Sequence, residues 1–173
     1  QIQAEYVAAI YRKAIITSKI DSVDDAILQL QSLVGDVTER PFGDSLDFQY
    51  RMARVHQALG TLIGDQGDLD TGYQHQQRAL EYIDQLLEAE PNNWEYQQER
   101  SVTLGKQVRF FGDRGQFDEA MALAKEALAG FDALDREQIN DSHLWMNRGL
   151  AVRVIGALNA STGDYKSAIS CFL

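Results

Sequence analysis

The chain has 173 residues, of which 16 are basic and 26 acidic, so its formal net charge at neutral pH is −10. Because an acidic surface repels phosphates, we do not expect a nucleic-acid partner. The single cysteine, Cys171, excludes an internal disulfide and favours a reducing compartment, and no apolar run approaches the roughly 20 residues that cross a bilayer. We therefore expect a cytoplasmic protein without membrane segments.

Apolar residues three and four positions apart predict that the chain is helical throughout. The pattern is clearest from Phe117 to Leu134, and no stretch shows the period-two alternation of a strand. In chain order the expected helices cover about 2–18, 22–35, 45–64, 69–90, 93–112, 117–135, 141–160 and 165–173. Side chains that cap helix N-termini recur 48 residues apart, at Asp44-Ser45, Asn92-Asn93 and Asn140-Asp141.

The chain also contains an internal repeat of 48 residues, which is the spacing of Gly67, Gly115 and Gly163. The acidic run around Gly67 lacks the alternating carboxylates of a calcium loop, and its acids are replaced by Arg114 and Gln116 one repeat later. It is therefore interpreted as a turn between helices. The expected organisation is a single domain over 1–173, with repeats at about 1–43 (diverged), 44–91, 92–139 and 140–173 (truncated).

The order Leu59-Gly60, Gly67, Leu69, Gly72, Ala79 resembles the tetratricopeptide repeat (TPR), in a long-period variety found in large bacterial proteins. The usual TPR period is about 34 residues. The resemblance implies an all-α, right-handed superhelical stack of antiparallel helical hairpins, in which small residues let paired helices approach closely. It implies a protein-interaction scaffold. The alternative is a regulatory or oligomerising segment of a multidomain signalling protein that carries a serine/threonine kinase or signalling NTPase domain.

Charge divides unevenly between the helices of each repeat. The first helices, over 48–64, 96–112 and 144–160, hold seven basic residues and one acidic residue, whereas the second helices, over 69–90 and 117–135, hold two basic and ten acidic residues. Because first helices line the concave groove of TPR proteins, the resemblance implies a basic groove that attracts an acidic peptide or protein segment. The expected ligand-binding residues are Arg54, Gln57, Lys106, Arg109 and Arg153. Alternatively, the cations only pair with the neighbouring acidic helices across the interior of each hairpin, which is worth about 0–1 kcal/mol per exposed pair.

No catalytic residue, cofactor or metal is expected. The three histidines, His56, His75 and His143, lack the short spacings that place two metal ligands on one helix face, so we expect ordinary, partly exposed side chains. The sequence has neither a phosphate-cradling glycine motif nor a nucleophile elbow.

Two further sets of apolar residues bear on partners. Trp94 and Trp145 lie near the starts of first helices, where aromatic residues pack at repeat junctions, and a binding hot spot is the alternative. In the last helix an apolar stripe needs a cover, so either another repeat follows in the parent chain or this end pairs with a second copy. That stripe consists of Tyr165, Ala168, Ile169 and Phe172. A homodimer formed through this C-terminal repeat is therefore a further hypothesis.

Overall fold

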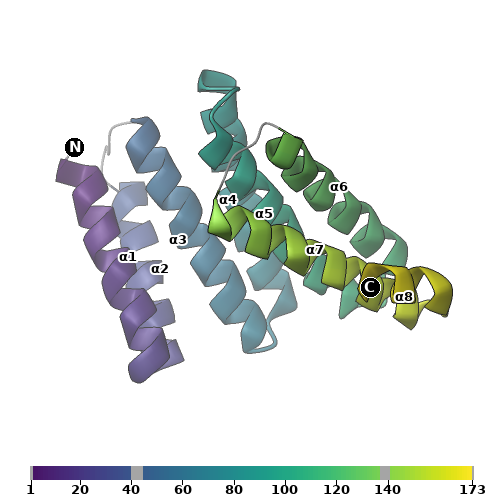
Figure 1. Ribbon diagram of the computed structural model, residues 1–173. Coiled ribbons are helices and arrows are strands. Elements are labelled where there is room, and N and C mark those ends of the chain that lie inside the picture. Colours follow the sequence, from purple (N-terminus) through teal and green to yellow (C-terminus); the bar gives the residue numbers. More distant parts are fainter. Residues whose placement is uncertain (1, 40–44, 137–140, 173) are drawn as a thin grey trace. The chain divides into compact units, whose positions relative to one another are not determined.

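The computed structural model describes residues 2–39, 45–136 and 141–172, and within these ranges the chain forms helices and no strand. Successive helices pair as antiparallel hairpins (Figure 1). The pairs are α1 (Ile2–Ile20) with α2 (Val23–Glu39), α3 (Leu46–Asp65) with α4 (Leu69–Ala89), α5 (Trp94–Gly112) with α6 (Phe117–Arg136), and α7 (Ser142–Ser161) with α8 (Tyr165–Phe172). The predicted all-α class and hairpin architecture are confirmed. The largest boundary difference is in α2, which continues to Glu39 instead of ending near residue 35.

The chain divides into two compact units. The N-terminal unit, Gln1–Ala89, holds α1 to α4, and the C-terminal unit, Glu90–Leu173, holds α5 to α8. The single domain expected over 1–173 stays a prediction.

The repeat period of the sequence is also the period of the helices, because α3, α5 and α7 begin at Leu46, Trp94 and Ser142. Each of these helices is capped by the residue predicted for it. The Ser45 hydroxyl accepts a hydrogen bond from the Phe48 N–H, the Asn93 amide oxygen accepts from Glu95 and Tyr96, and the Asp141 carboxylate accepts from His143 and Leu144. The neighbouring candidates Asp44 and Asn140 lie outside the described residues.

The glycines that define the period have backbone angles that L side chains rarely adopt. Gly67, Gly115 and Gly163 have φ values of 96°, 73° and 84°, in the left-handed region that follows the ends of helices. These positions join α3 to α4, α5 to α6 and α7 to α8, so the interpretation as interhelical turns is confirmed.

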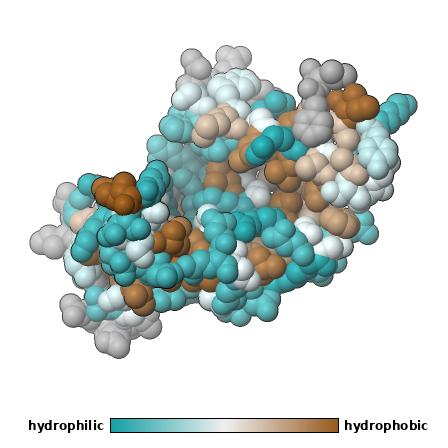
Figure 2. Space-filling model, turned by 90° about the horizontal axis from the view of Figure 1, so that it is seen from below, coloured by the Kyte–Doolittle hydropathy of each residue, from teal (hydrophilic) through white to brown (hydrophobic). Residues whose placement is uncertain are grey.

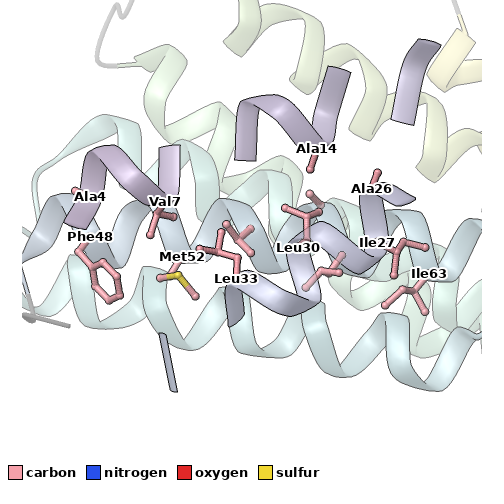
Figure 3. Close-up of a cluster of buried hydrophobic side chains, with 13 residues drawn as sticks. Ala4, Val7, Ala14, Ala26, Ile27, Leu30, Leu33, Phe48, Met52 and Ile63 are labelled. Atoms are coloured by element: carbon pink, nitrogen blue, oxygen red, sulfur yellow. The ribbon is translucent and has the colours of Figure 1, made fainter. Parts of the chain in front are cut away.

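The core of the N-terminal unit fills the space between its helices. Val7 of α1, Leu30 and Leu33 of α2, and Met52 and Leu59 of α3 are each at most 1% exposed. Figure 3 shows side chains from these three helices meeting in one cluster. In the C-terminal unit, Phe110, Phe131, Leu134 and Leu144 are similarly enclosed.

Within the second hairpin, α3 and α4 approach closely at Gly60. A Cβ atom added there would lie 2.8 Å from the main-chain oxygen of Gly72 and 2.6 Å from Nε2 of Gln76. The Gln76 side chain is fully buried, and its Nε2 donates to the main-chain oxygen of Gln57 at 3.0 Å. A small residue is therefore required at this crossing, as the resemblance implied.

Candidate partner-binding site

The five predicted ligand-binding residues occupy different environments. In the N-terminal unit, Arg54 is exposed on α3, with its guanidinium carbon 5.6 Å from the centre of the Tyr11 ring, whereas the Gln57 side chain is 5% exposed. In the C-terminal unit, Arg109 is exposed and Lys106 half-buried on α5. Both line the same pocket, while Arg153 is exposed on α7.

That pocket, the α5–α7 pocket, has a volume of about 240 Å³ and is walled by three helices of the C-terminal unit. Most of its lining is apolar, and Lys106 and Arg109 supply its positive charge. The residues are Ser101, Val102, Gly105, Lys106, Val108 and Arg109 of α5, Ala124, Ala127 and Phe131 of α6, and Asn147, Leu150, Ala151 and Val154 of α7.

The sequence forms this pocket because small and large residues alternate along the helix faces that meet there. On α5, Val102, Gly105 and Arg109 are three and four positions apart and share one face. Gly105 has no side chain to fill the space: a Cβ added there would meet nothing within 4 Å. On α7, Leu150 and Val154 have the same four-residue spacing and form the opposite wall.

Apolar surface continues along α7 beside the pocket. Trp145 is 47% exposed, Met146 63% and Leu150 47%. The expectation that Trp145 packs in a junction is wrong, because the neighbouring Leu144 takes the core position and is fully buried. Apolar side chains also reach the surface on the face drawn in Figure 2, as brown patches among teal polar residues.

Some first-helix cations form ion pairs with other helices. Arg51, Arg100 and Arg148 each contact a carboxylate of a neighbouring helix. The pairs are Arg51 with Glu5 at 3.5 Å, Arg100 with Glu126 at 2.9 Å and Arg148 with Asp132 at 2.7 Å. The Arg100 pair crosses the interior of one hairpin, as the alternative interpretation expects, whereas the Arg51 and Arg148 pairs join helices of different hairpins. Each pair is worth about 0–1 kcal/mol at such partly exposed positions. None of the three is among the predicted ligand-binding residues.

The structure also joins two histidines that are 19 positions apart in the sequence. The Nδ1 atoms of His56 on α3 and His75 on α4 lie 2.9 Å apart, and the His56 ring stacks on Tyr82 with centroids 5.8 Å apart. The prediction of a partly exposed side chain is wrong for His56. This residue is 6% exposed because the α3–α4 hairpin closes over it. Burial, and then the nearby His75 and Arg78, lower the pKa of His56 to about 3, and burial also lowers the pKa of His75.

The chemistry available at the α5–α7 pocket is recognition of an amphipathic ligand. Its walls can bury an apolar side chain, and Lys106 and Arg109 can bind carboxylates next to that side chain. In the described ranges, no three or more histidine, cysteine or acidic residues gather where they could hold a metal ion. No described helix is long and apolar enough to span a bilayer.

Charge counting from the sequence identified Lys106 and Arg109 but missed the apolar walls of the pocket. A signal for the walls was present: Leu150 and Val154 follow the spacing of a helix face, opposite a face that contains Gly105. That signal could not locate the pocket, because the spacing within one helix does not predict which faces of α5, α6 and α7 pack together.

In sequence, the chain matches no protein-family model and no curated relative. In structure, it is similar to BtubC (BKLC) from P. vanneervenii, with 14% identity and a TM-score of 0.74 over 95% of this chain and 59% of BtubC. The chain thus spans about three fifths of BtubC, and at this identity the likeness shows a shared fold.

Two further structures contain the nearly identical TPR-like repeats of a Podosopora anserina kinesin light chain, the second with a single substitution to methionine. They have 16% and 14% identity and TM-scores of 0.44 and 0.45. The matches cover 98% and 99% of this chain, and 92% and 93% of those chains. The hairpins, their glycine turns and their close helix crossing give this chain a TPR-like helical-repeat fold.

Proposed function

We propose that this chain is a cytoplasmic, non-catalytic protein-interaction module that binds an acidic segment of a partner protein. The observation that carries the proposal is the α5–α7 pocket, in which an apolar cavity of about 240 Å³ is lined by two cationic residues, Lys106 and Arg109. A TPR-like fold serves as an interaction scaffold, and the pocket indicates where a partner segment would bind.

Size and charge together define the expected ligand. An enclosed apolar cavity of about 150 Å³ holds a benzene ring, so the α5–α7 pocket has room for one large apolar side chain. Lys106 and Arg109 favour carboxylates on either side of that side chain, since charge-assisted hydrogen bonds are the stronger ones. Arg54 and Arg153, both exposed, would contribute longer-range attraction for an acidic partner.

Labelled synthetic peptides test this proposal by fluorescence anisotropy. The test peptide has glutamates on both sides of one phenylalanine, and two matched peptides replace either the phenylalanine by alanine or the glutamates by glutamine. We expect the test peptide to bind more tightly than either. Its affinity should fall as ionic strength rises from about 0.01 M to about 0.1 M, which shortens the Debye length from about 30 Å to about 10 Å.

Matched variants separate the pocket from general charge effects. The double variant Lys106→Glu, Arg109→Glu should lose the peptide. The control Lys125→Glu, Lys166→Glu makes the same change in net charge at exposed positions of the same unit that do not line the pocket, and it should retain the peptide. Equal binding of the glutamate and glutamine peptides, or equal loss in the two variants, would refute the proposal.

A second candidate function is self-association through α8, as in an oligomerising segment of a larger signalling protein. The observation that favours it is the exposure of Tyr165, at 66%, and Ile169, at 59%, on one side of α8, while Ala168 is buried. The side chain of Phe172, predicted to share that stripe, lies outside the described residues. Two copies that cover each other's α8 would bury this apolar surface.

A further inference from the structure

The N-terminal unit contains a second pocket, chemically unlike the first. It lies between α1 and α3, has a volume of about 270 Å³, and is called the arginine pocket below. Its lining consists of Ala8, Tyr11 and Arg12 of α1, and Tyr50, Arg51 and Arg54 of α3. Three arginines and two tyrosines therefore line one depression.

Two of its arginines are held in place by contacts from the same two helices. The guanidinium of Arg51 lies 3.0 Å from the Asp47 carboxylate and 3.5 Å from the Glu5 carboxylate. The guanidinium carbon of Arg54 lies 5.6 Å from the centre of the Tyr11 ring, in a cation–π contact. Such contacts reduce the side-chain freedom that a ligand would otherwise have to remove on binding.

Three arginines give the lining of the arginine pocket its positive charge, and two carboxylates contact one of them, Arg51. Those carboxylates belong to Glu5 and Asp47, whereas Arg12 and Arg54 are exposed to solvent. Among the described residues, the lining itself holds three cationic side chains and no acidic one, which favours an anionic ligand.

The kind of anion follows from the number and geometry of the donors. A guanidinium forms paired, parallel hydrogen bonds with carboxylates or phosphates, so one arginine already satisfies a single carboxylate. A phosphate monoester carries a charge of about −1.5 to −2 at pH 7 and three strong acceptor oxygens, so it can use several arginines at once. Two tyrosines also line the pocket, and a phenol hydroxyl is a neutral hydrogen-bond donor.

We propose that the arginine pocket binds the phosphate group of a phosphorylated serine or threonine in a partner protein. This proposal rests on the function proposed above, because the phosphorylated residue would belong to an acidic segment of a partner protein. The size of the pocket fits: liquid water takes about 30 Å³ per molecule, so 270 Å³ has room for the few non-hydrogen atoms of a phosphoserine side chain.

Small probes test this proposal without a known partner. Phosphoserine with blocked termini, the corresponding blocked serine, blocked glutamate and inorganic phosphate are titrated into the ¹⁵N-labelled chain. Amide and arginine Nε–H signals are followed by NMR. We expect saturable shifts for blocked phosphoserine at Arg12, Tyr50 and Arg54, weaker binding of inorganic phosphate, and no saturation with blocked serine or blocked glutamate.

Two variants make the result specific to the pocket. The variant Arg12→Gln, Arg54→Gln removes two cations but keeps Arg51 and its ion pairs, and it should bind blocked phosphoserine about tenfold more weakly, since charge-assisted contacts are lost. The control Lys13→Gln, Lys19→Gln removes the same charge from exposed positions of α1 that do not line the pocket, and it should bind like the parent chain.

Several outcomes overturn the proposal. Absence of saturable shifts, equal weakening in both variants, or binding of blocked glutamate as tight as that of blocked phosphoserine would show that the pocket does not recognise phosphate. If inorganic phosphate binds as tightly as blocked phosphoserine, the ligand of the pocket is a free anion and not a phosphorylated protein. If these probes fail while the glutamate–phenylalanine peptide still binds the α5–α7 pocket, only the phosphate proposal falls. If blocked phosphoserine binds the arginine pocket while the glutamate–phenylalanine peptide does not bind, only the acidic-peptide proposal for the α5–α7 pocket falls.

Discussion

The buried histidine pair makes the stability of the α3–α4 hairpin depend on pH. Burial, the neighbouring His75 and the Arg78 charge lower the pKa of His56 from 6.5 to about 3. The unfolded chain therefore takes up a proton at His56 as pH falls below about 6.5, while the folded chain does not. Stabilisation of the fold by neutral His56 is fully present above pH 6.5 and is lost as pH falls toward the native pKa.

The size of the effect follows from the unfolded-state pKa, because the native pKa lies well below the pH range used. Between about pH 8 and about pH 5.5 the His56 contribution to the unfolding free energy falls by ~1.4 kcal/mol. Proteins tend to associate at a pH near the isoelectric point. Both pH values lie above the isoelectric point of this sequence, about 4.7. Hydrogen bonds lower the pKa of Asp68 and Asp164 below 3.8, so these carboxylates lose their contribution only at more acidic pH.

Urea denaturation followed by circular dichroism at the two pH values measures this loss. The variant His56→Gln should lose ~1.4 kcal/mol less than the parent chain between the two pH values, whatever its stability at pH 8. The variant His143→Gln, at an exposed position of α7, should lose as much as the parent. If the parent chain and His56→Gln lose the same amount, the reasoning about the buried pair is wrong.

Three further predictions concern packing, turns and assembly. Gly60→Ala should lower the unfolding free energy by about 1–3 kcal/mol, because the new Cβ would meet the main chain of Gly72. The control Gly149→Ala, at an open helix position, should raise the unfolding free energy by about 0.5–1 kcal/mol. Equal effects of the two substitutions in urea denaturation would contradict this prediction. Gly115→Ala should cost about 1–2 kcal/mol at its φ of 73° and lower the thermal midpoint, while Gly115→Asn should cost less; an unchanged midpoint for the alanine variant counts against the turn assignment. Tyr165→Lys should shift the chain from dimer to monomer in light scattering, and a parent chain that stays monomeric when concentrated excludes the α8 dimer.

Much of the fold could be predicted from the sequence because its signals are local. A cap such as Asn93 bonds to residues two and three positions further on, and Gly115 is required by its own backbone angle. The apolar stripe of α6 follows from helix geometry alone. For the described ranges, these features determined the number, order and approximate bounds of the helices, with a 48-residue period that the structure reproduces.

The candidate sites depend on which helix faces meet, and only the tertiary structure decided that. The sequence indicated that first helices are basic, yet it did not distinguish Arg148, paired with Asp132, from Arg109, which lines a pocket. Likewise, His56 and His75 lie on different helices, so no spacing rule for one helix could bring them together. The physical reason is range: capping and turn angles involve residues within one helical turn, whereas pockets, ion pairs and pKa shifts depend on atoms that are far apart in the chain and become neighbours only when the helices pack.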